Sequence, residues 1–460
     1  MNCSELVTKT DSIYPGLNRD DANVLVVGMG ATGLSVVRYL KEQGVRLFAV
    51  DSRENPPGLE AVRSFLNDSQ LSVGGFSAEL FELATHIVVS PGVSLDLPEL
   101  VKAQSDGKPV LGDIDLFACQ VKVPVIAITG SNGKSTVTTL VGLMAEQSGR
   151  KVAVGGNLGR PALDLLMDRD IELYVLELSS FQLDSSKLLN AKVATVLNVS
   201  EDHLDRYSDF GGYINSKKRV FNGAGAMILN RDDSEVMEMA LADRAVITFG
   251  LNEPQEGQYG ILNVEGKSWL AKGDKPLFPT SKLKIKGKHN QANGLAALAL
   301  GEQVGLPMIA MLDALSKFKG LAHRMEWVME VDGVEWINDS KATNVGACEA
   351  ALQGLSEKVV LIAGGDGKDA DFTPLAESAK NRVKAAILMG QDADKLASVL
   401  SEVTEVIKVS DMNEAVSVAV KVAERSDTVL LSPACASLDQ YKSYQERGNC
   451  FVEAVGALAQ

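Results

Sequence analysis

The sequence is poor in cysteine, lacks long apolar runs and has fewer basic than acidic residues. Its 460 residues include five scattered cysteines, with no CxxC pair and no Cys/His cluster. This scatter argues against a zinc site or a disulfide framework and favours a reducing, cytoplasmic location. No stretch approaches about 18 uninterrupted apolar residues, and the N-terminus has no basic start followed by an apolar run. We therefore expect neither a membrane span nor a signal peptide.

The charge balance excludes a further class of function. Lys and Arg number 45 against 60 Asp and Glu, which gives a formal net charge of -15. A nucleic-acid-binding protein needs a basic surface, so we expect no nucleic-acid partner. Hydrophobic residues make up 45% and charged residues 23%, the balance of a globular protein rather than of a disordered chain, a collagen or a coiled coil.

Short apolar runs typical of buried strands alternate with helical stretches along most of the chain. This alternation predicts an α/β fold with mostly parallel sheets. The runs fall into three series, at 23–28, 46–50 and 86–90, at 123–129, 173–178 and 193–199, and at 359–363, 385–389 and 428–431. We therefore predict three α/β domains, 1–112, 113–320 and 321–460, each with its own mostly parallel sheet.

The first chemical motif is GMGATG at residues 28–33, directly after a strand and opening a helix. Glycines let the backbone approach a phosphate, and the helix N-terminus favours the anion. Asp51 follows the next strand, where an acid can hold a ribose hydroxyl. The motif predicts a nucleotide or nucleotide-sugar site, but does not separate NAD from another diphosphate. A purely structural turn is the alternative.

The second motif is TGSNGKST at residues 129–136, again between a strand and a helix. Backbone N–H groups of such a loop wrap triphosphate oxygens, Lys134 would neutralise the β- and γ-phosphates, and Ser135 or Thr136 could bind Mg²⁺. The loop departs from the standard phosphate-loop pattern because Ile128 stands where the first glycine is expected. A helix cap with a chance lysine is the weak alternative.

Three further segments supply candidate metal or catalytic groups. Glu177 ends a strand and His203 follows another among acids, so each could bind a metal, although a solvated acid and a structural histidine are the alternatives. Lys217 lies in a basic helical stretch that pattern alone does not single out. Polar clusters at 289–293, 323–326 and 338–344, and loops at 364–368 and 431–441, are placed to contact nucleotide and small anions.

Taken together, these segments resemble the Mur ligase family. The matching stretches, in family order, are ITGSNGKST, ELSSFQL, NVSEDHLDRY, GKHNQAN, HRMEW, INDSKATN, GGDGKDADF and SPACASLDQY. The resemblance covers nearly the whole chain after about residue 20 and is in detail to the D-glutamate-adding members. It implies a UDP-binding, an ATP-binding and a C-terminal Rossmann-like domain.

The resemblance also implies the reaction. An ATP-dependent ligase would join D-glutamate to UDP-N-acetylmuramoyl-L-alanine through an acyl phosphate, in cytoplasmic peptidoglycan synthesis. It implies ATP, Mg²⁺ (two ions), a carbamoylated Lys217 and a monomeric protein. The catalytic and metal groups implied are Lys134, Ser135, Glu177, His203 and Lys217 as a carbamate.

The resemblance assigns the remaining site residues in three sets. For ATP they are Gly130, Asn132, Gly133, Lys134, Ser135, Thr136, Asn290, Asn293, Arg324 and Asp339. For the UDP substrate they are Thr32, Asp51, Ser52, Arg53, Gly92, Asn157, Ser179 and Gln182. For D-glutamate they are Lys341, Thr343, Lys368, Ser437, Leu438 and Tyr444.

Three alternatives stay open at this point. Another ligase of the same superfamily would add a different amino acid or extend folate with glutamate. A nicotinamide-dependent oxidoreductase would use GMGATG and Asp51, but would leave TGSNGKST unexplained. A non-catalytic nucleotide-binding module would require the loss of Lys134, Glu177, His203 and Lys217, all of which are present.

Overall fold

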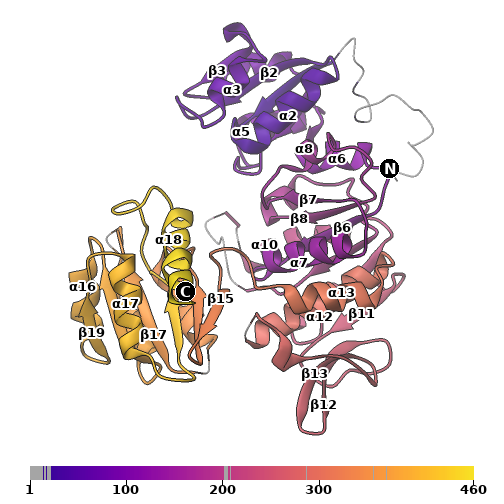
Figure 1. Ribbon diagram of the computed structural model, residues 1–460. Coiled ribbons are helices and arrows are strands. Elements are labelled where there is room, and N and C mark those ends of the chain that lie inside the picture. Colours follow the sequence, from indigo (N-terminus) through magenta and orange to yellow (C-terminus); the bar gives the residue numbers. More distant parts are fainter. Residues whose placement is uncertain are drawn as a thin grey trace. The chain divides into compact units, whose positions relative to one another are not determined.

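The computed structural model describes residues 14, 17, 22–200, 206–207, 209–285, 287–355, 357–368 and 370–459. The chain forms two compact units. The first unit comprises Met1–Pro279 and Ala292–Leu315, and the second comprises Thr280–Gln291 and Ser316–Gln460. Figure 1 shows three sheets, two of them in the first unit and one in the second.

The first sheet is a five-stranded parallel sheet in the order β3-β2-β1-β4-β5. Its strands are β1 (Asn23–Val27), β2 (Arg46–Asp51), β3 (Leu71–Val73), β4 (His86–Val89) and β5 (Val110–Leu111). Helices α2 (Ala31–Glu42) and α3 (Leu59–Arg63) cover one face, and α4 (Ala78–Leu83) and α5 (Pro98–Ser105) cover the other. Both faces are therefore buried, which explains the unbroken apolar strands.

The second sheet has nine strands in the order β14-β13-β12-β11-β10-β9-β6-β8-β7. The parallel strands are β6 (Val125–Thr129), β7 (Val152–Gly156), β8 (Leu173–Glu177), β9 (Val193–Val196), β10 (Ala226–Asn230), β11 (Val246–Phe249) and β12 (Tyr259–Val264). Strands β13 (Lys267–Lys272) and β14 (Lys275–Pro279) extend the edge beyond β12 as antiparallel hairpins.

One apolar cluster joins the first two sheets. It contains Val24, Val26 and Val36 from the first sheet and its helix α2, and Leu176 and Met227 from the second sheet. Helices α6 (Asp113–Gln120), α8 (Ala162–Leu165), α9 (Ser180–Asp184) and α11 (Ser234–Met237) contribute to the same cluster. The Arg38 guanidinium on α2 also pairs with Asp164 on α8 at 2.7 Å. The first unit is thus built on a shared core.

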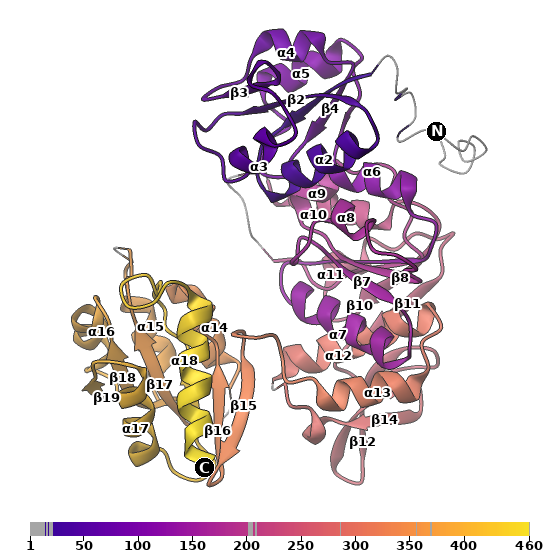
Figure 2. The same ribbon diagram turned by 45° about the horizontal axis from the view of Figure 1, so that its top comes forward.

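The second unit holds a six-stranded sheet in the order β15-β16-β20-β17-β18-β19 (Figure 2). The strands are β15 (Glu326–Val331), β16 (Val334–Asn338), β17 (Val359–Gly364), β18 (Val383–Met389), β19 (Glu405–Lys408) and β20 (Thr428–Leu431), and only β15 is antiparallel to its neighbour. Helices α14 (Val345–Gln353), α15 (Thr373–Ala379) and α16 (Ala393–Leu400) cover one face. Helices α17 (Met412–Val422) and α18 (Tyr444–Gly456) cover the other.

The predicted α/β class, with three mostly parallel sheets, is confirmed. Each predicted block supplies the strands of one sheet, while the boundaries at 112 and 320 stay predictions. Among the described residues, no helix is both long and apolar enough to cross a membrane.

Candidate active site

The turn at residues 28–33 connects β1 to α2 and leaves no room for a side chain at Gly28 or Gly33. Gly28 has a φ of 94°, and a Cβ on Gly33 would lie 1.8 Å from the Gly28 carbonyl oxygen. The helix therefore begins tightly against the strand end. In the described residues of α2, the first turn has no acidic side chain, and Gly30 at the N-cap offers none. The N–H groups at this helix end are thus suited to an anionic ligand.

Asp51, at the end of β2, holds this turn in place. One carboxylate oxygen accepts the Met29 N–H at 2.7 Å, and both oxygens accept the Arg53 guanidinium, at 2.7 and 2.8 Å. Burial alone would raise the pKa of Asp51, but Arg53 and the backbone donors hold that pKa below its ordinary value. The structure thus gives Asp51 a supporting role at the turn, whereas its predicted ribose contact stays a prediction.

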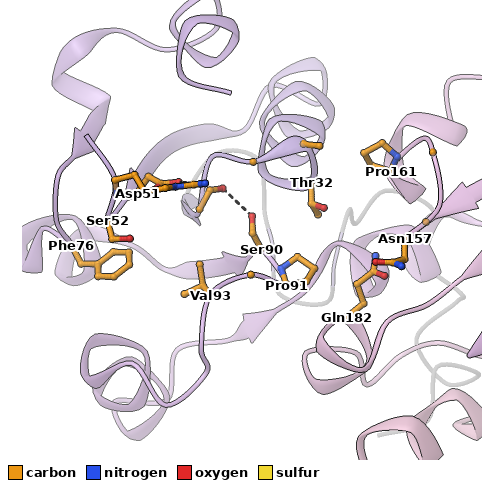
Figure 3. A pocket seen from close by; sticks show the side chains of 17 residues that line it. Thr32, Asp51, Ser52, Phe76, Ser90, Pro91, Val93, Asn157, Pro161 and Gln182 are labelled. Carbon is orange, nitrogen blue, oxygen red and sulfur yellow. Dashed lines mark hydrogen bonds and ion pairs between the residues drawn. The ribbon is translucent and has the colours of Figure 1, made fainter. Parts of the chain in front are cut away.

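A cavity of about 530 Å³ opens over this turn (Figure 3). That volume suits a small-molecule ligand. Seven of the eight residues predicted for the UDP substrate line it, and Ser179 is the exception. The lining residues are Gly28, Gly30, Ala31, Thr32, Asp51, Ser52, Arg53, Phe76, Ser90, Pro91, Gly92, Val93, Gly156, Asn157, Gly159, Pro161 and Gln182.

The second glycine-rich loop connects β6 to α7 (Lys134–Gln147). Asn198, after β9, fixes the loop from the side: its Oδ1 accepts the Asn132 N–H at 2.8 Å, and its Nδ2 donates to the Asn132 carbonyl at 3.0 Å. Gly133 has a φ of 82°, and a Cβ there would lie 2.5 Å from Asn293 Oδ1. The structure therefore brings Asn293, predicted for ATP, against the loop.

Two lysine ammonium groups meet at this loop. Lys134 Nζ donates to the Gly130 carbonyl at 2.9 Å, and Lys217 Nζ donates to the same oxygen at 2.8 Å. Lys217 lies on α10 (Phe210–Lys218), is only 2% exposed, and also sits over the Tyr213 ring at 4.5 Å. Two cations sharing one acceptor repel each other, so the pair favours an anion between them or a change of charge on one lysine.

Glu177 ends β8 beside β6, paired in register with Ile128. Its Oε1 accepts Asn157 Nδ2 at 2.6 Å, while Oε2 is buried and, among the described residues, has no hydrogen-bond partner. A buried carboxylate oxygen without a partner is costly unless a ligand satisfies it. No group of three or more His, Cys, Asp or Glu side chains gathers in the described part of the chain. Mg²⁺ takes one or two carboxylates and completes its shell with substrate phosphates and water, so Glu177 Oε2 is a candidate ligand for this ion.

Ser179 and Gln182 form a capping box at the start of α9. The Gln182 N–H donates to Ser179 Oγ at 3.2 Å, and the Ser179 N–H donates back to Gln182 Oε1 at 3.2 Å. The Gln182 amide nitrogen points to Asp113 Oδ2 at 3.5 Å. Asp113 is 1% exposed, and burial raises its pKa to about 6. Ser179 thus supports Gln182, and Gln182 lines the cavity.

In the second unit, Asp339 lies at the end of β16 and is buried. Its carboxylate accepts the Ser432 hydroxyl at 2.9 Å and the Met325 N–H at 3.2 Å. Burial raises the pKa of Asp339 to about 7. Arg324 precedes Met325 and is exposed. The structure therefore brings Arg324 and Asp339, both predicted for ATP, close together at the end of β16. Asn290, also predicted for ATP, lies buried on α12 (Lys288–Gln303).

The residues predicted for D-glutamate lie at the carboxyl ends of neighbouring strands in this unit. Lys341 Nζ sits over the Tyr444 ring at 4.3 Å. Ser437 is buried and Leu438 is 70% exposed in the loop after β20. A backbone bridge between Asp366 and Ala436 connects that loop to the one carrying Lys368. Thr343 follows Lys341 and donates its N–H to the Lys341 carbonyl at 2.8 Å.

A buried arginine that the sequence did not single out binds these loops together. Arg447 on α18 is 1% exposed and donates to Ser340 Oγ and to the carbonyls of Ser340, Gly364, Cys435 and Ala436, at 2.9 to 3.3 Å. None of these acceptors in the described chain is a carboxylate. Burial lowers the pKa of Arg447 to about 10.

Some predicted residues are not placed, and some site residues were missed. His203 lies outside the described residues. Phe76 and Ser90 line the cavity but were not predicted, although Ser90 ends the predicted strand 86–90. The position of Ser90 after a strand was the available signal, since ligands gather at strand ends in parallel sheets. Phe76 and Arg447 carried no such signal.

The first unit thus has the geometry of a phosphate-loop nucleotide-binding protein, and comparison with known proteins narrows this class. Three family models match: "Mur ligase MurD-like, N-terminal domain" at residues 22–112, "Mur ligase middle domain" at 128–301, and "Mur ligase, glutamate ligase domain" at 323–435. The chain belongs to the Mur ligase family.

Curated relatives match over nearly the whole chain. The UDP-N-acetylmuramoylalanine–D-glutamate ligase of Methylococcus capsulatus is 54% identical over 95% of both chains. The enzyme of the same name from Pseudomonas putida is 50% identical over 95% of this chain and 97% of the relative. The crystal structure of UDP-N-acetylmuramate-alanine ligase MurC from Thermotoga maritima shares the fold at 19% identity, with a TM-score of 0.56 over 95% of this chain and 99% of that one.

Proposed function

We propose that this chain joins D-glutamate to UDP-N-acetylmuramoyl-L-alanine with cleavage of ATP to ADP and phosphate, a step of peptidoglycan synthesis. The curated relatives at 50–54% identity bear the name of this activity. The observation that carries the proposal is the hydrogen bond from Asn157 to Glu177, at 2.6 Å. It connects a residue lining the cavity to the carboxylate beside the phosphate loop, so a carboxylate held in the cavity can lie next to a triphosphate.

The reaction needs two transfers. The alanyl carboxylate oxygen attacks the γ-phosphorus of ATP, the bond to the bridging oxygen breaks, and ADP leaves. The amine of D-glutamate then attacks the acyl phosphate carbon, loses a proton and expels inorganic phosphate. A carboxylate is a poor electrophile, and phosphorylation gives it a leaving group. Because the first step brings two anions together, positive charge at the loop is required.

The residues of the phosphate loop fit this requirement. We infer that Gly130, Asn132 and Gly133 present backbone groups to the phosphates, that Lys134 releases the Gly130 carbonyl to pair with them, and that Asn293, Asn290, Arg324 and Asp339 contact the rest of ATP. Enzymes of this family are ATP-dependent and need Mg²⁺. Glu177, with Ser135 or Thr136 and His203, would hold the ion, which offsets phosphate charge when bound.

Lys217 is proposed to carry a carbamate. Its buried ammonium shares the Gly130 carbonyl with Lys134, and carbamoylation would replace the like charge with an anion. The ammonium first loses a proton, and the neutral amine then adds to CO₂ and releases a second proton, which gives a carboxylate able to bind Mg²⁺. Lys217→Ala should lose activity that small carboxylic acids restore, and intact-mass analysis should show the added CO₂. A plain amine by mass together with no chemical rescue would overturn this assignment.

The D-glutamate site is proposed at Lys341, Thr343, Lys368, Ser437, Leu438 and Tyr444, above the buried Arg447. A dicarboxylate suits this site because Lys341 and Lys368 offer cations that can pair with its two carboxylates. We further propose that the protein acts as a monomer in the cytoplasm, where its nucleotide substrates are made.

The test is phosphate release from ATP and Mg²⁺ with UDP-N-acetylmuramoyl-L-alanine, with D-glutamate, L-glutamate, L-lysine and diaminopimelate in parallel. We expect release with D-glutamate alone and a product whose mass has grown by one glutamyl residue. Release with another amino acid would keep the ligase chemistry and overturn the D-glutamate site. No release from folded protein that binds ATP would overturn the nucleotide-sugar substrate.

A further inference from the structure

One end of the cavity over α2 carries an aromatic side chain to which nothing above gives a role. Phe76 is the one aromatic side chain among the described residues that line the cavity. Figure 3 shows it beside Ser52, at the end opposite Asn157 and Gln182, with Val93 between it and the middle of the cavity. The sequence around Phe76 carries no recognisable motif.

The position of Phe76 is fixed from two sides. The Gly74 and Gly75 N–H groups, just before it, donate to the carbonyls of Arg53 and Asp51 at 3.1 and 3.4 Å. Behind the ring, Phe81 packs edge to face, with centroids 6.4 Å apart and planes at 90°. Phe76 also packs on the apolar cluster between the first sheet and helices α4 and α5. A ring held in this way is a preorganised surface.

The groups that line the cavity differ from one end to the other. The middle is the N-terminal end of α2, where backbone N–H groups suit a diphosphate. The Asn157 end leads to Glu177 through a hydrogen bond, so the reacting carboxylate belongs there. A UDP-sugar-peptide has its base at one end, its diphosphate in the middle and its carboxylate at the other end. The base therefore falls at the Phe76 end.

We propose that Phe76 is the stacking surface for the nucleobase and determines the affinity of this site for the uridine part of the substrate. Ser52 and Arg53, on the adjoining loop, supply donors for the carbonyl oxygens of a pyrimidine. Arg53 is suited to this because Asp51 fixes its guanidinium with two hydrogen bonds while its side chain stays 53% exposed. This assignment rests on the proposed function and names the residue that recognises one part of its substrate.

The test compares two competitive inhibitors against UDP-N-acetylmuramoyl-L-alanine in the full chain. Uridine monophosphate contains the base, and N-acetylmuramoyl-L-alanine 1-phosphate lacks it. Phe76→Ala should raise the inhibition constant of uridine monophosphate roughly 10-fold, the size typical of losing one base–aromatic stack. The constant for the base-free inhibitor should stay within about twofold, because the rest of the cavity is unchanged. KM for ATP and for D-glutamate should also stay unchanged.

Three variants serve as controls. Phe76→Tyr keeps the ring and should keep the affinity. Phe76→Leu keeps most of the apolar volume, so it should fold and still weaken uridine monophosphate binding. Phe81→Leu removes the ring behind Phe76 without lining the cavity and should have a smaller effect on both inhibitors.

The outcomes separate this proposal from the proposed function. Unchanged inhibition by uridine monophosphate in Phe76→Ala and Phe76→Leu, with normal wild-type turnover, would overturn the stacking role alone. Equal weakening of both inhibitors would also overturn it and leave Phe76 as support for the cavity wall. Absence of turnover in the wild type would overturn the proposed function itself.

Discussion

The first unit contains two strand–glycine loop–helix turns that differ in chemistry. The turn before α2 carries no lysine, and its nearest carboxylate, Asp51, is fully engaged by Arg53 and the Met29 N–H. The loop before α7 carries Lys134, has Lys217 against the same carbonyl, and stands beside Glu177 with a buried oxygen that has no partner in the described chain.

The difference indicates what each turn can do. A turn whose charges already satisfy one another can bind an anion without reacting with it. A loop that has two lysines at one carbonyl, and beside it a carboxylate oxygen with no partner in the described chain, is suited to binding a triphosphate and a metal, and so it can lower the barrier to phosphoryl transfer. Four substitutions test this contrast, in order of expected effect.

Replacing Lys134 should have the largest effect. Lys134→Ala removes the cation that neutralises the attacked phosphate, so kcat/KM should fall by at least about 100-fold. Phosphate release measures the loss, and the melting temperature should stay close to that of the wild type. Lys151→Ala, an exposed lysine of the same unit, is the matched control and should retain full activity. Near-normal turnover in Lys134→Ala would show that the loop before α7 promotes phosphoryl transfer no better than the turn before α2.

Glu177→Gln should shift the Mg²⁺ dependence. Glutamine can still accept from Asn157 but is a weaker ligand for a hard cation, so half-maximal activity should require about 10-fold more Mg²⁺. A Mg²⁺ titration of phosphate release measures this. The control is Glu172→Gln, an exposed glutamate of the same unit that accepts the Lys151 N–H, which should leave the titration unchanged. If Glu177→Gln and the wild type give the same Mg²⁺ titration curve, Glu177 is not a ligand of the metal.

Asp51→Asn should act on the other turn only. It weakens two charge-assisted hydrogen bonds to Arg53, so KM for the UDP substrate should rise about 10-fold while KM for ATP stays unchanged. Because the pKa of Asp51 is lowered in the folded protein, its contribution to stability is present above the unfolded pKa and is lost as the pH falls through the folded pKa. The exposed Asp68→Asn is the control. Equal changes in both KM values would refute the separation of the two sites.

Asp113→Asn should have the smallest effect, on stability. Asp113 is buried with a pKa raised to about 6, so the folded protein binds its proton more tightly than the unfolded chain. The free energy of unfolding of the wild type therefore falls as the pH rises from about 4 through 6, and asparagine removes that loss. The variant should melt a few degrees higher than the wild type at pH 8, roughly the effect of 1 kcal/mol, and the difference should be smaller at pH 4.5. A difference in melting temperature that does not change with pH would contradict the raised pKa.

The two glycine loops were predictable because their chemistry lies in consecutive residues between a strand and a helix. Lys217 was not predictable from its own surroundings, since its partner Gly130 is 87 residues away. The basic stretch around it is the pattern of an exposed helix face, and only the family resemblance singled it out. Arg447 was missed for the same reason: its acceptors come from three loops that the sheet brings together. Phe76 depends on a loop held by backbone hydrogen bonds that leave no sequence motif.

The apolar cluster shared by the first two sheets has a consequence for how the chain is made. A fragment ending at residue 112 would lack Leu116 and Phe117, which are fully buried in that cluster, and would expose the apolar residues that they cover. We therefore expect such a fragment to aggregate on a ribosome or in a test tube. The lining of the cavity is complete only after Gln182 has been made, well beyond the last strand of the first sheet.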